Sequence, residues 1–449
     1  MSELELFRRL RQRGEQPAIV SQERTYSYNQ LLAQIEQYRC LVRQRLASTP
    51  AGSTIAIRGD YGFERIAMFL AVIAEHRVAV LLPTAASNLA QKCGITHSHW
   101  LFDPAQSDTL EPTGIGATES HPLLCTLANN EQAGFVVFSS GSTAEPKAAL
   151  HDFEKFSSHI LTANKSKRTL GFLLLDHIAG VDTLLYTLYA GGCLVIPSSR
   201  SVPDVLHTIE QCQVQVLPAS PSFLRLLSLM PINFERDLSS LEIITYGSEP
   251  IVASTLEKIR ALFPDVQLIQ KYGTTEFGSP RTRTRAGDGT WIRLDSESMT
   301  TRIENGILWV KTNSAMLGYL NAAQPEQRDG WICTGDRVIS DGHWYRILGR
   351  DSELINVGGE KVFPSEVEAV IEELDWIETA VVSGESHSIL GQIVVASVRL
   401  IGEETEQVKK LIRNHCRSRL EPYKVPVKVK VARQPLRNVR HKKVRSLDA

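Results

Sequence analysis

The clearest candidate for chemistry is a run of small polar residues that follows an apolar, strand-like segment, in FVVFSSGSTAEPK at residues 135–147. Hydroxyl groups and a glycine allow backbone N–H groups to close around phosphate oxygens, and a lysine adds positive charge. The sequence therefore predicts a phosphate-binding loop made of Ser139, Ser140, Gly141, Ser142, Thr143 and Lys147. The spacing Gly-x-x-x-x-Gly-Lys-Ser/Thr is absent, which excludes a Walker A loop. Taken alone, such residues more often form an ordinary turn.

Two further stretches place polar residues at the ends of expected strands. QKYGTTEFG, residues 270–278, contains Tyr272, Gly273, Thr274, Thr275 and Glu276. By itself it also fits a strand that ends in a capped helix. Thr334-Gly335-Asp336 is followed by YRILGR, which ends in Arg350. An aspartate after a glycine is usually a turn residue, so this second stretch is weak evidence on its own.

The C-terminal tail is strongly basic. From Lys424 to Arg445 there are nine Lys or Arg residues and no Asp or Glu. Without other information, this pattern indicates a nucleic-acid or membrane patch, or a solvated tail.

Taken in this order, the stretches resemble the motifs of the adenylate-forming superfamily, which includes acyl-CoA and aryl-CoA synthetases, adenylation domains and firefly luciferase. Residues 139–148 follow the pattern Thr/Ser-Ser-Gly-Ser/Thr-Thr-Gly-x-Pro-Lys-Gly, except that Ala144 and Ala148 replace glycines. Residues 270–278 resemble the Tyr-Gly-x-Thr-Glu motif. The resemblance runs from PAIVSQERTYSYNQLL near the start to the last lysines, which favours an enzyme over a basic binding protein.

The resemblance implies a role for each nucleotide-binding residue. Tyr272 stacks on adenine, Thr275 meets the α-phosphate and Glu276 holds Mg²⁺. These roles suit an aromatic face, a hydroxyl and a hard oxygen ligand. Asp336 accepts hydrogen bonds from both ribose hydroxyls, and Arg350 reaches the ribose or the phosphates.

The family's catalytic lysine corresponds by resemblance to Lys442 in QPLRNVRHKKVRSL, residues 434–447. Counting four residues on from Asn438 and three back from Arg445 both select it, although His441 replaces the family's glycine and Lys443 is adjacent. Its ammonium would bridge the substrate carboxylate and the α-phosphate as pyrophosphate departs.

Resemblance also implies an acid pocket and a hinge. His177, Tyr246 and Gly247 line the pocket, and the segment Ser248-Glu249-Pro250 packs against adenine. Amino-acid-activating relatives place an aspartate where this chain has Ile178, so a simple α-amino acid is the less expected substrate. Asp176 and Asp182 lie close to this position in the sequence, so an amino acid substrate stays an alternative. The hinge lies at Asp351 and Ser352, and Gly358-Gly359 lines a pantetheine tunnel after the small domain has turned.

The elements that must position these residues alternate along the chain. Strand-like runs, among them residues 54–59, 77–82, 169–175 and 241–247, alternate with helical patterns, which predicts parallel sheets in an α/β fold. After about residue 287, Asp-Gly turns between short alternating segments predict antiparallel hairpins. We expect an N-terminal region of layered α/β sheets at 1–350, with a small antiparallel β part, and a mobile α+β cap at 351–449.

Composition limits the alternatives. The 49 Lys and Arg balance 50 Asp and Glu, so no overall charge draws the chain to nucleic acid or anionic lipid. Seven scattered cysteines without a Cys-x-x-Cys spacing fit a reducing cytoplasm better than a disulfide framework or a zinc site. The N-terminus fits a surface helix, and the most apolar stretch, residues 171–197, is interrupted by charged residues, so we expect no signal peptide and no membrane span.

We therefore expect an AMP-forming acid–thiol ligase that uses ATP and Mg²⁺ to activate a small carboxylic acid and transfers the acyl group to coenzyme A. Two alternatives stay open. One is an adenylation enzyme that loads the phosphopantetheine arm of a carrier protein, and the other is a non-catalytic nucleic-acid-binding or regulatory relative suggested by the basic tail and by Ser352, Ala144 and His441.

Overall fold

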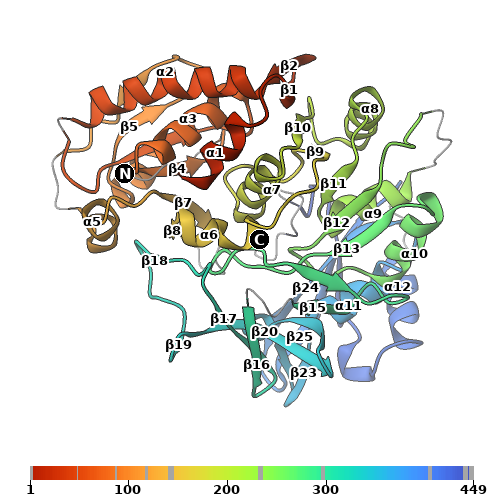
Figure 1. Cartoon of the computed structure of the whole chain (residues 1–449). Coiled ribbons are helices and arrows are strands. Elements are labelled where there is room, and N and C mark those ends of the chain that lie inside the picture. Colours follow the sequence, from red (N-terminus) through yellow and green to blue (C-terminus); the bar gives the residue numbers. More distant parts are fainter. Residues whose placement is uncertain are drawn as a thin grey trace.

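Strands of the described residues form four sheets, and helices cover the two sheets that contain parallel strands at their centre (Figure 1). The structure is a computed structural model that describes residues 4–47, 49–85, 88–116, 120–139, 146–230, 236–294, 299–402, 407–437 and 443. The expected α/β class is confirmed: two mixed sheets come first, an antiparallel sheet follows, and a small α+β unit ends the chain.

The first mixed sheet has the strand order β18-β8-β7-β4-β3-β5-β6. Its centre, β7 to β5, is parallel, while β8, β18 and β6 run antiparallel to their neighbours. The strands are β3 (Thr54–Arg58), β4 (Val78–Leu82), β5 (Ser98–Phe102), β6 (Leu110–Pro112), β7 (Gly134–Ser139), β8 (Lys147–Asp152) and β18 (Gly318–Tyr319).

The second mixed sheet has the order β13-β12-β11-β9-β10-β1-β2 and is parallel except for the β1–β2 hairpin. The strands are β1 (Pro17–Ser21), β2 (Arg24–Ser27), β9 (Arg168–Leu170), β10 (Cys193–Ile196), β11 (Val216–Ala219), β12 (Ile243–Tyr246) and β13 (Gln267–Gln270). The strand expected at 169–175 is shorter than predicted. Its last hydrogen bond to the neighbouring strand runs from the Gly171 N–H to the Val195 carbonyl. Beyond it, the Arg200 side chain donates hydrogen bonds to the carbonyls of Gly171 and Phe172.

Helices of the N-terminal region pack on both mixed sheets, and α7 lies between them (Figure 1). The Ser27 hydroxyl accepts a hydrogen bond from the Gln30 N–H, and the Gln30 side-chain oxygen accepts one from the Ser27 N–H, which fixes the start of α2. The helices are α1 (Glu5–Arg11), α2 (Tyr28–Leu46), α3 (Phe63–Ala74), α4 (Leu89–Ile95), α5 (Pro122–Asn129), α6 (Phe153–Ser157), α7 (Ile178–Tyr189), α8 (Val202–Cys212), α9 (Pro221–Leu229) and α10 (Ala253–Leu262). Among the described residues, no helix has the length and apolar character needed to cross a bilayer.

The expected antiparallel part follows β13. Its sheet has the order β14-β15-β21-β20-β17-β16, with β19 beside β20. The strands are β14 (Thr282–Thr284), β15 (Ile292–Leu294), β16 (Met299–Glu304), β17 (Ile307–Thr312), β19 (Gln327–Arg328), β20 (Trp331–Asp341) and β21 (Trp344–Arg350).

The C-terminal cap packs α11 and α12 on its own sheet and has a separate apolar core. Its elements are β22 (Ile355–Val357), β23 (Glu360–Val362), α11 (Pro364–Ile371), β24 (Ile377–His387), β25 (Gly391–Leu400), α12 (Val408–Arg417) and β26 (Lys428–Val431). The basic tail contains a strand that the sequence analysis missed, because β26 pairs in parallel with β25. The boundary at residue 350/351 stays a prediction.

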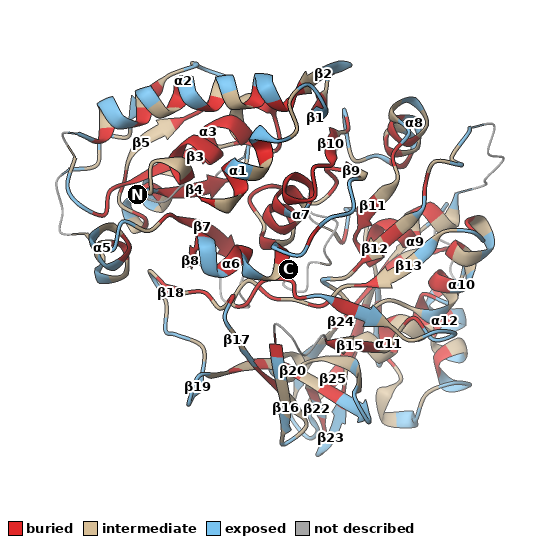
Figure 2. Cartoon of the chain, in the orientation of Figure 1, coloured by how far each residue is buried: buried red, intermediate tan, exposed pale blue. Residues whose placement is uncertain are grey.

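The core of the first mixed sheet contains one histidine. Figure 2 shows β7 and β8 buried beneath the helices. His151 of β8 is fully buried, lies opposite Phe135 of β7, and stacks on the Phe135 ring with centroids 4.9 Å apart. Burial disfavours the charged imidazolium, which lowers the pKa of His151 to about 4.

Replacing His151 with Gln should remove part of the acid sensitivity of folding. The unfolded chain takes up this proton near pH 6.5, whereas the folded chain takes it up near pH 4, so stability falls as the pH drops through this window. Wild type should lose up to about 3 kcal/mol more than the variant between pH 6.5 and 4. Melting curves at several pH values measure this, and parallel pH profiles for the two proteins would contradict the assignment.

Candidate active site

The loops that carry the predicted nucleotide residues leave the carboxyl ends of parallel strands, where α/β sheets usually bind ligands. The segment 247–250 follows β12 and the segment 271–276 follows β13, and these strands are neighbours. The two loops touch closely, because a Cβ added to Gly247 would lie 2.4 Å from the Lys271 carbonyl oxygen. The second loop is also folded tightly on itself: a Cβ added to Gly273 would lie 2.2 Å from the Gly278 oxygen. Glycine is required at both positions because any side chain would separate these segments.

Asp336 is the centre of a buried polar cluster. Its carboxylate accepts a hydrogen bond from the Tyr272 hydroxyl at 2.7 Å and pairs with Arg350 Nε at 2.8 Å. Burial raises the pKa of Asp336, and Arg350 and Tyr272 oppose that rise. The Arg350 guanidinium also donates to the Thr334 carbonyl oxygen at 3.0 Å. The structure thus brings the predicted Tyr272, Asp336 and Arg350 together, although Tyr272 is only 8% exposed.

Glu276 lies in the same region with its carboxylate partly satisfied. The Tyr319 hydroxyl donates to Glu276 Oε1 at 2.6 Å. Burial alone would raise the pKa of Glu276, but hydrogen bonds from Thr274 and Tyr319 and the charge of Arg350 lower it overall. Glu276 is therefore an anion at neutral pH, which suits an oxygen ligand for Mg²⁺. Among the described residues there is no cluster of three or more His, Cys, Asp or Glu that could hold a metal unaided.

The ends of the predicted phosphate loop lie beside this carboxylate. Ser139 closes β7 and Lys147 opens β8, and the two residues face each other in the antiparallel pair. The Lys147 ammonium lies 5.5 Å from the centroid of the Tyr319 ring. Four predicted loop residues, Ser140, Gly141, Ser142 and Thr143, lie outside the described residues, as does Lys442.

A segment that the sequence analysis did not select, residues 314–321, joins these parts. Its edge strand β18 pairs with β8, and the Asn321 side chain accepts from the Ala148 N–H at 2.8 Å and donates to the Pro146 carbonyl at 3.0 Å. On the other side, the Met316 N–H donates to the Glu276 carbonyl at 2.8 Å. No local signal marks Tyr319 or Asn321 in the sequence, because their partners are more than 40 residues away.

The predicted acid-pocket residues are placed unequally. His177 is the partly exposed residue that precedes α7. Tyr246 is 1% exposed and its hydroxyl donates to the Gly289 carbonyl at 2.7 Å, so it packs in the core of the second mixed sheet. Thr275 and Gly247 are half-buried, and which of these residues contact an acid stays a prediction.

Residues 248–250 face the cap. Ser248 adopts a positive φ of 71°, and the Glu249 carboxylate accepts hydrogen bonds from the Ser222 hydroxyl at 2.7 Å and from the Lys443 N–H at 3.0 Å. Pro250 is exposed and lines the cavity next to these groups. The loop predicted to pack on adenine thus also contacts the cap.

At the predicted hinge, Asp351 pairs with Arg337 at 2.5 Å and Ser352 is exposed. Gly358 and Gly359 form the exposed turn between β22 and β23. Both have positive φ, of 61° and 97°, so the turn itself requires glycine whatever else these residues do. Their role in a thiol tunnel stays a prediction.

Comparison with known proteins identifies the family. The family model described as AMP-binding enzyme matches residues 79–320, which is more than half of the chain. The family model described as AMP-binding enzyme C-terminal domain matches residues 366–443. The chain belongs to the AMP-binding enzyme family, and the predicted resemblance to adenylate-forming enzymes is confirmed.

Individual relatives are distant. Acyl-CoA synthetase 7 of Caenorhabditis elegans is 29% identical over 324 residues, which cover 65% of this chain and 60% of that protein, so the chain spans less than two thirds of this relative. The medium/long-chain-fatty-acid–[acyl-carrier-protein] ligase FadD10 of Mycobacterium tuberculosis is 25% identical and aligns with 94% of this chain and 90% of its own length. The solved o-succinylbenzoate CoA synthetase of Bacillus subtilis, in complex with its acyl-adenylate intermediate, has a TM-score of 0.80 and 24% identity, and the match covers 99% of this chain and 97% of that one. This likeness shows a shared fold.

Replacing Asn321 with Ala should loosen the start of β8. The change removes the partners of the Ala148 N–H and the Pro146 carbonyl, which should cost about 1–2 kcal/mol of stability and weaken ATP binding. Melting curves and titration calorimetry with ATP measure the two effects. Asn414→Ala is the matched control, because Asn414 is exposed and its side chain accepts a long bond from Arg417 at 3.4 Å. Equal ATP affinity in both variants would contradict a role of Asn321 at the site.

Proposed function

We propose that this protein activates a carboxylic acid by joining it to the AMP part of ATP, with release of pyrophosphate, and then transfers the acyl group to a thiol, most simply that of coenzyme A. The observation that carries the proposal is the convergence of Glu276, Asp336 and Arg350 with both ends of the loop 139–147. This arrangement offers a carboxylate for a cation, a carboxylate for a sugar and positive charge for phosphates.

The described residues fit ATP and Mg²⁺. Mg²⁺ usually binds through one or two protein carboxylates together with substrate phosphates, so a lone Glu276 is sufficient. When bound, the cation neutralises charge on the phosphates as pyrophosphate leaves. We assign to Asp336 the acceptance of hydrogen bonds from ribose hydroxyls, which its fixed position between Tyr272 and Arg350 supports.

Activation is needed because a carboxylate would have to expel an oxide ion. In the mixed anhydride with AMP the leaving group is a stable phosphate monoester, so a thiol can displace it. We assign to Lys442 the bridging of the acid and the α-phosphate during the in-line attack. A nucleophilic side chain is not required for either step.

The acceptor is coenzyme A or the phosphopantetheine arm of a carrier protein. The nematode relative is named an acyl-CoA synthetase, which supports the first, whereas the mycobacterial relative is named a carrier-protein ligase and aligns with most of this chain, which supports the second. Thioester formation with carrier protein but not with free coenzyme A would decide for the second. A cytoplasmic location also stays a prediction, in agreement with seven cysteines that are all free.

Carboxylate-dependent exchange of labelled pyrophosphate into ATP tests the proposal directly. Screened over aryl, fatty and amino acids, the assay should give exchange with at least one class and name the acid. No exchange with any acid, together with salt-sensitive oligonucleotide binding, would favour the non-catalytic alternative.

Lys442→Ala should abolish most adenylate formation while thioester formation from a supplied acyl-adenylate stays largely intact. The reason is that the ammonium bridges the acid and the α-phosphate and neutralises charge while pyrophosphate departs, and this charge does not develop in the second step. Single-turnover assays of each half-reaction measure the difference. An equal loss in both steps would mean that this lysine is misassigned.

Tyr319→Phe should raise the Mg²⁺ concentration needed for half-maximal exchange by about tenfold or more, because the hydrogen bond that positions Glu276 is one to a charged group and contributes about 1.5–3 kcal/mol. Mg²⁺ titration at saturating ATP measures the shift. Tyr186→Phe, at a tyrosine that is 45% exposed, is the matched control and should leave the titration unchanged. An unshifted curve for Tyr319→Phe would remove Tyr319 from the cation site.

A further inference from the structure

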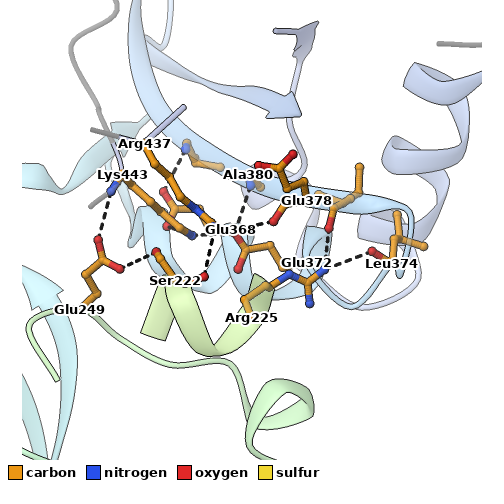
Figure 3. Close-up of polar contacts among 12 residues, drawn as sticks. Ser222, Arg225, Glu249, Glu368, Glu372, Leu374, Glu378, Ala380, Arg437 and Lys443 are labelled. Carbon is orange, nitrogen blue, oxygen red and sulfur yellow. Dashed lines mark hydrogen bonds and ion pairs between the residues drawn. The ribbon is translucent and has the colours of Figure 1, made fainter. Parts of the chain in front are cut away.

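Lys443, the neighbour of Lys442, is held by carboxylates of the cap (Figure 3). Its ammonium pairs with Glu372 Oε1 at 2.8 Å and with Glu368 Oε2 at 3.1 Å. Both carboxylates belong to the region of α11 and are only 4% exposed, while the Lys443 side chain is 15% exposed. Burial works against the charged ammonium, yet Glu368 and Glu372 raise the pKa of Lys443 overall.

The same carboxylates also hold the cap backbone. Glu368 Oε1 accepts from the Val382 N–H at 2.9 Å, and Glu372 Oε1 accepts from the Ala380 N–H at 3.0 Å. Lys443 is therefore fixed to the two elements that form the centre of the cap, α11 and β24. Since its ammonium is already paired twice, Lys443 is a poor candidate for the catalytic cation.

From this position the tail reaches the large domain at two points. The Lys443 N–H donates to Glu249 Oε1 at 3.0 Å, and the Arg437 guanidinium donates to the Ser222 carbonyl at 3.0 Å and to the Glu378 carbonyl at 3.1 Å. Arg437 and Lys443 are themselves paired by an antiparallel bridge. The two residues that flank 438–442 are thus held side by side against the large domain.

Arg225 of α9 makes the reciprocal contact from the large domain. Its guanidinium donates to the carbonyls of Leu374 at 3.3 Å and Ile377 at 2.7 Å, both in the cap, and the residue is 2% exposed. A hydrogen bond from the Phe223 N–H to the Ser220 hydroxyl fixes the start of α9 and so the position of Ser222 and Arg225. The groups that make these contacts line one shared cavity: Ser222, Arg225, Glu249, Glu372, Arg437 and Lys443.

We propose that Lys443 is a positioning residue that, paired with Glu368 and Glu372 and bound to Glu249, anchors the tail so that the adjacent Lys442 enters the site for adenylate formation. Arg437 and Lys443 flank residues 438–442, and both bind the large domain, so the anchor fixes the two ends of this stretch. The inference rests on the proposed function for Lys442. The contacts with Glu249, the Ser222 carbonyl and Arg225 cross the domain interface, and they must open when the cap turns for thioester formation.

Lys443→Met tests the anchor. Misplacement of a reacting group by about 1 Å can cost about 100-fold, so adenylate formation should fall by about 10- to 100-fold. Thioester formation from supplied acyl-adenylate should change less than about twofold, because this step needs the anchor open. Arg225→Met, which alters the large domain and leaves the cap carboxylates paired, should lower adenylate formation with the same selectivity.

Lys424→Met is the matched control. Like Lys443, Lys424 is a largely buried lysine of the cap that pairs with two carboxylates of the cap, Glu366 at 2.7 Å and Glu421 at 3.1 Å. Its N–H, however, donates to the Glu421 carbonyl within the cap and not to the large domain. The control should lower stability without changing the ratio of the two half-reactions. If Lys443→Met lowered both half-reactions equally, or if the control changed their ratio as much, the anchor would be refuted.

A second measurement separates the anchor from the catalytic proposal. Energy transfer between probes introduced as unnatural amino acids at exposed Glu131 and Asn414 reports the cap position without any substrate. Lys443→Met and Arg225→Met should broaden or shift the distance distribution, and Lys424→Met should not. An unchanged distance distribution in both Lys443→Met and Arg225→Met would overturn the inference, whether or not the wild type is active in pyrophosphate exchange. If the wild type is inactive but the distribution shifts in both variants, the anchor is retained and the proposed function is rejected.

Discussion

The candidate site depends on the hydrogen bonds of residues 314–321, because the groups that must act together belong to different sheets. The loop 139–147 lies between strands of the first mixed sheet, Glu276 follows the second, and residues 314–321 follow β17 of the antiparallel sheet. Pairing of β18 with β8, the Asn321 clamp and the bond from Tyr319 to Glu276 fix the three sheets relative to one another. The Tyr319 side chain contacts both Lys147, through its ring, and Glu276, through its hydroxyl. The positive and the negative group therefore lie close together without forming an ion pair with each other.

The interface between the cap and the large domain is made in a different way. The contacts that cross it in Figure 3 are hydrogen bonds and charged groups, and the apolar core of the cap closes on itself. Polar interfaces of this kind are typical of domains that move relative to each other. Directional bonds also specify one orientation while they exist, and their groups can return to water when the interface opens. This combination suits an interface between the cap and the large domain that forms in one orientation during one reaction step and is broken during the next.

Much of the secondary structure could be read from the sequence, because alternation and helical periodicity are local properties. The parallel sheets, the antiparallel part and the α+β cap were all predicted. Two errors have clear causes. The strand expected at 169–175 ends at Leu170 because Arg200, 30 residues away, binds the carbonyls that would continue the ladder. Strand β26 was not predicted because the lysines that alternate with its valines give the segment the charge of a solvated tail, although the alternation has the period of a strand.

The sequence by itself determined the family, the order of the motifs and the chemical character of each loop, because these depend on residue types at short spacing. It could not decide that the Tyr319 hydroxyl donates to Glu276 or that the Asn321 side chain binds the start of β8. Nor could it decide that Lys443 pairs with Glu368 and Glu372, which leaves Lys442 as the candidate for catalysis. Each of these contacts joins residues 43 to 173 positions apart in the chain. Only the packing of separate sheets and of the cap brings them within hydrogen-bond distance, and no local pattern of residues encodes such a meeting.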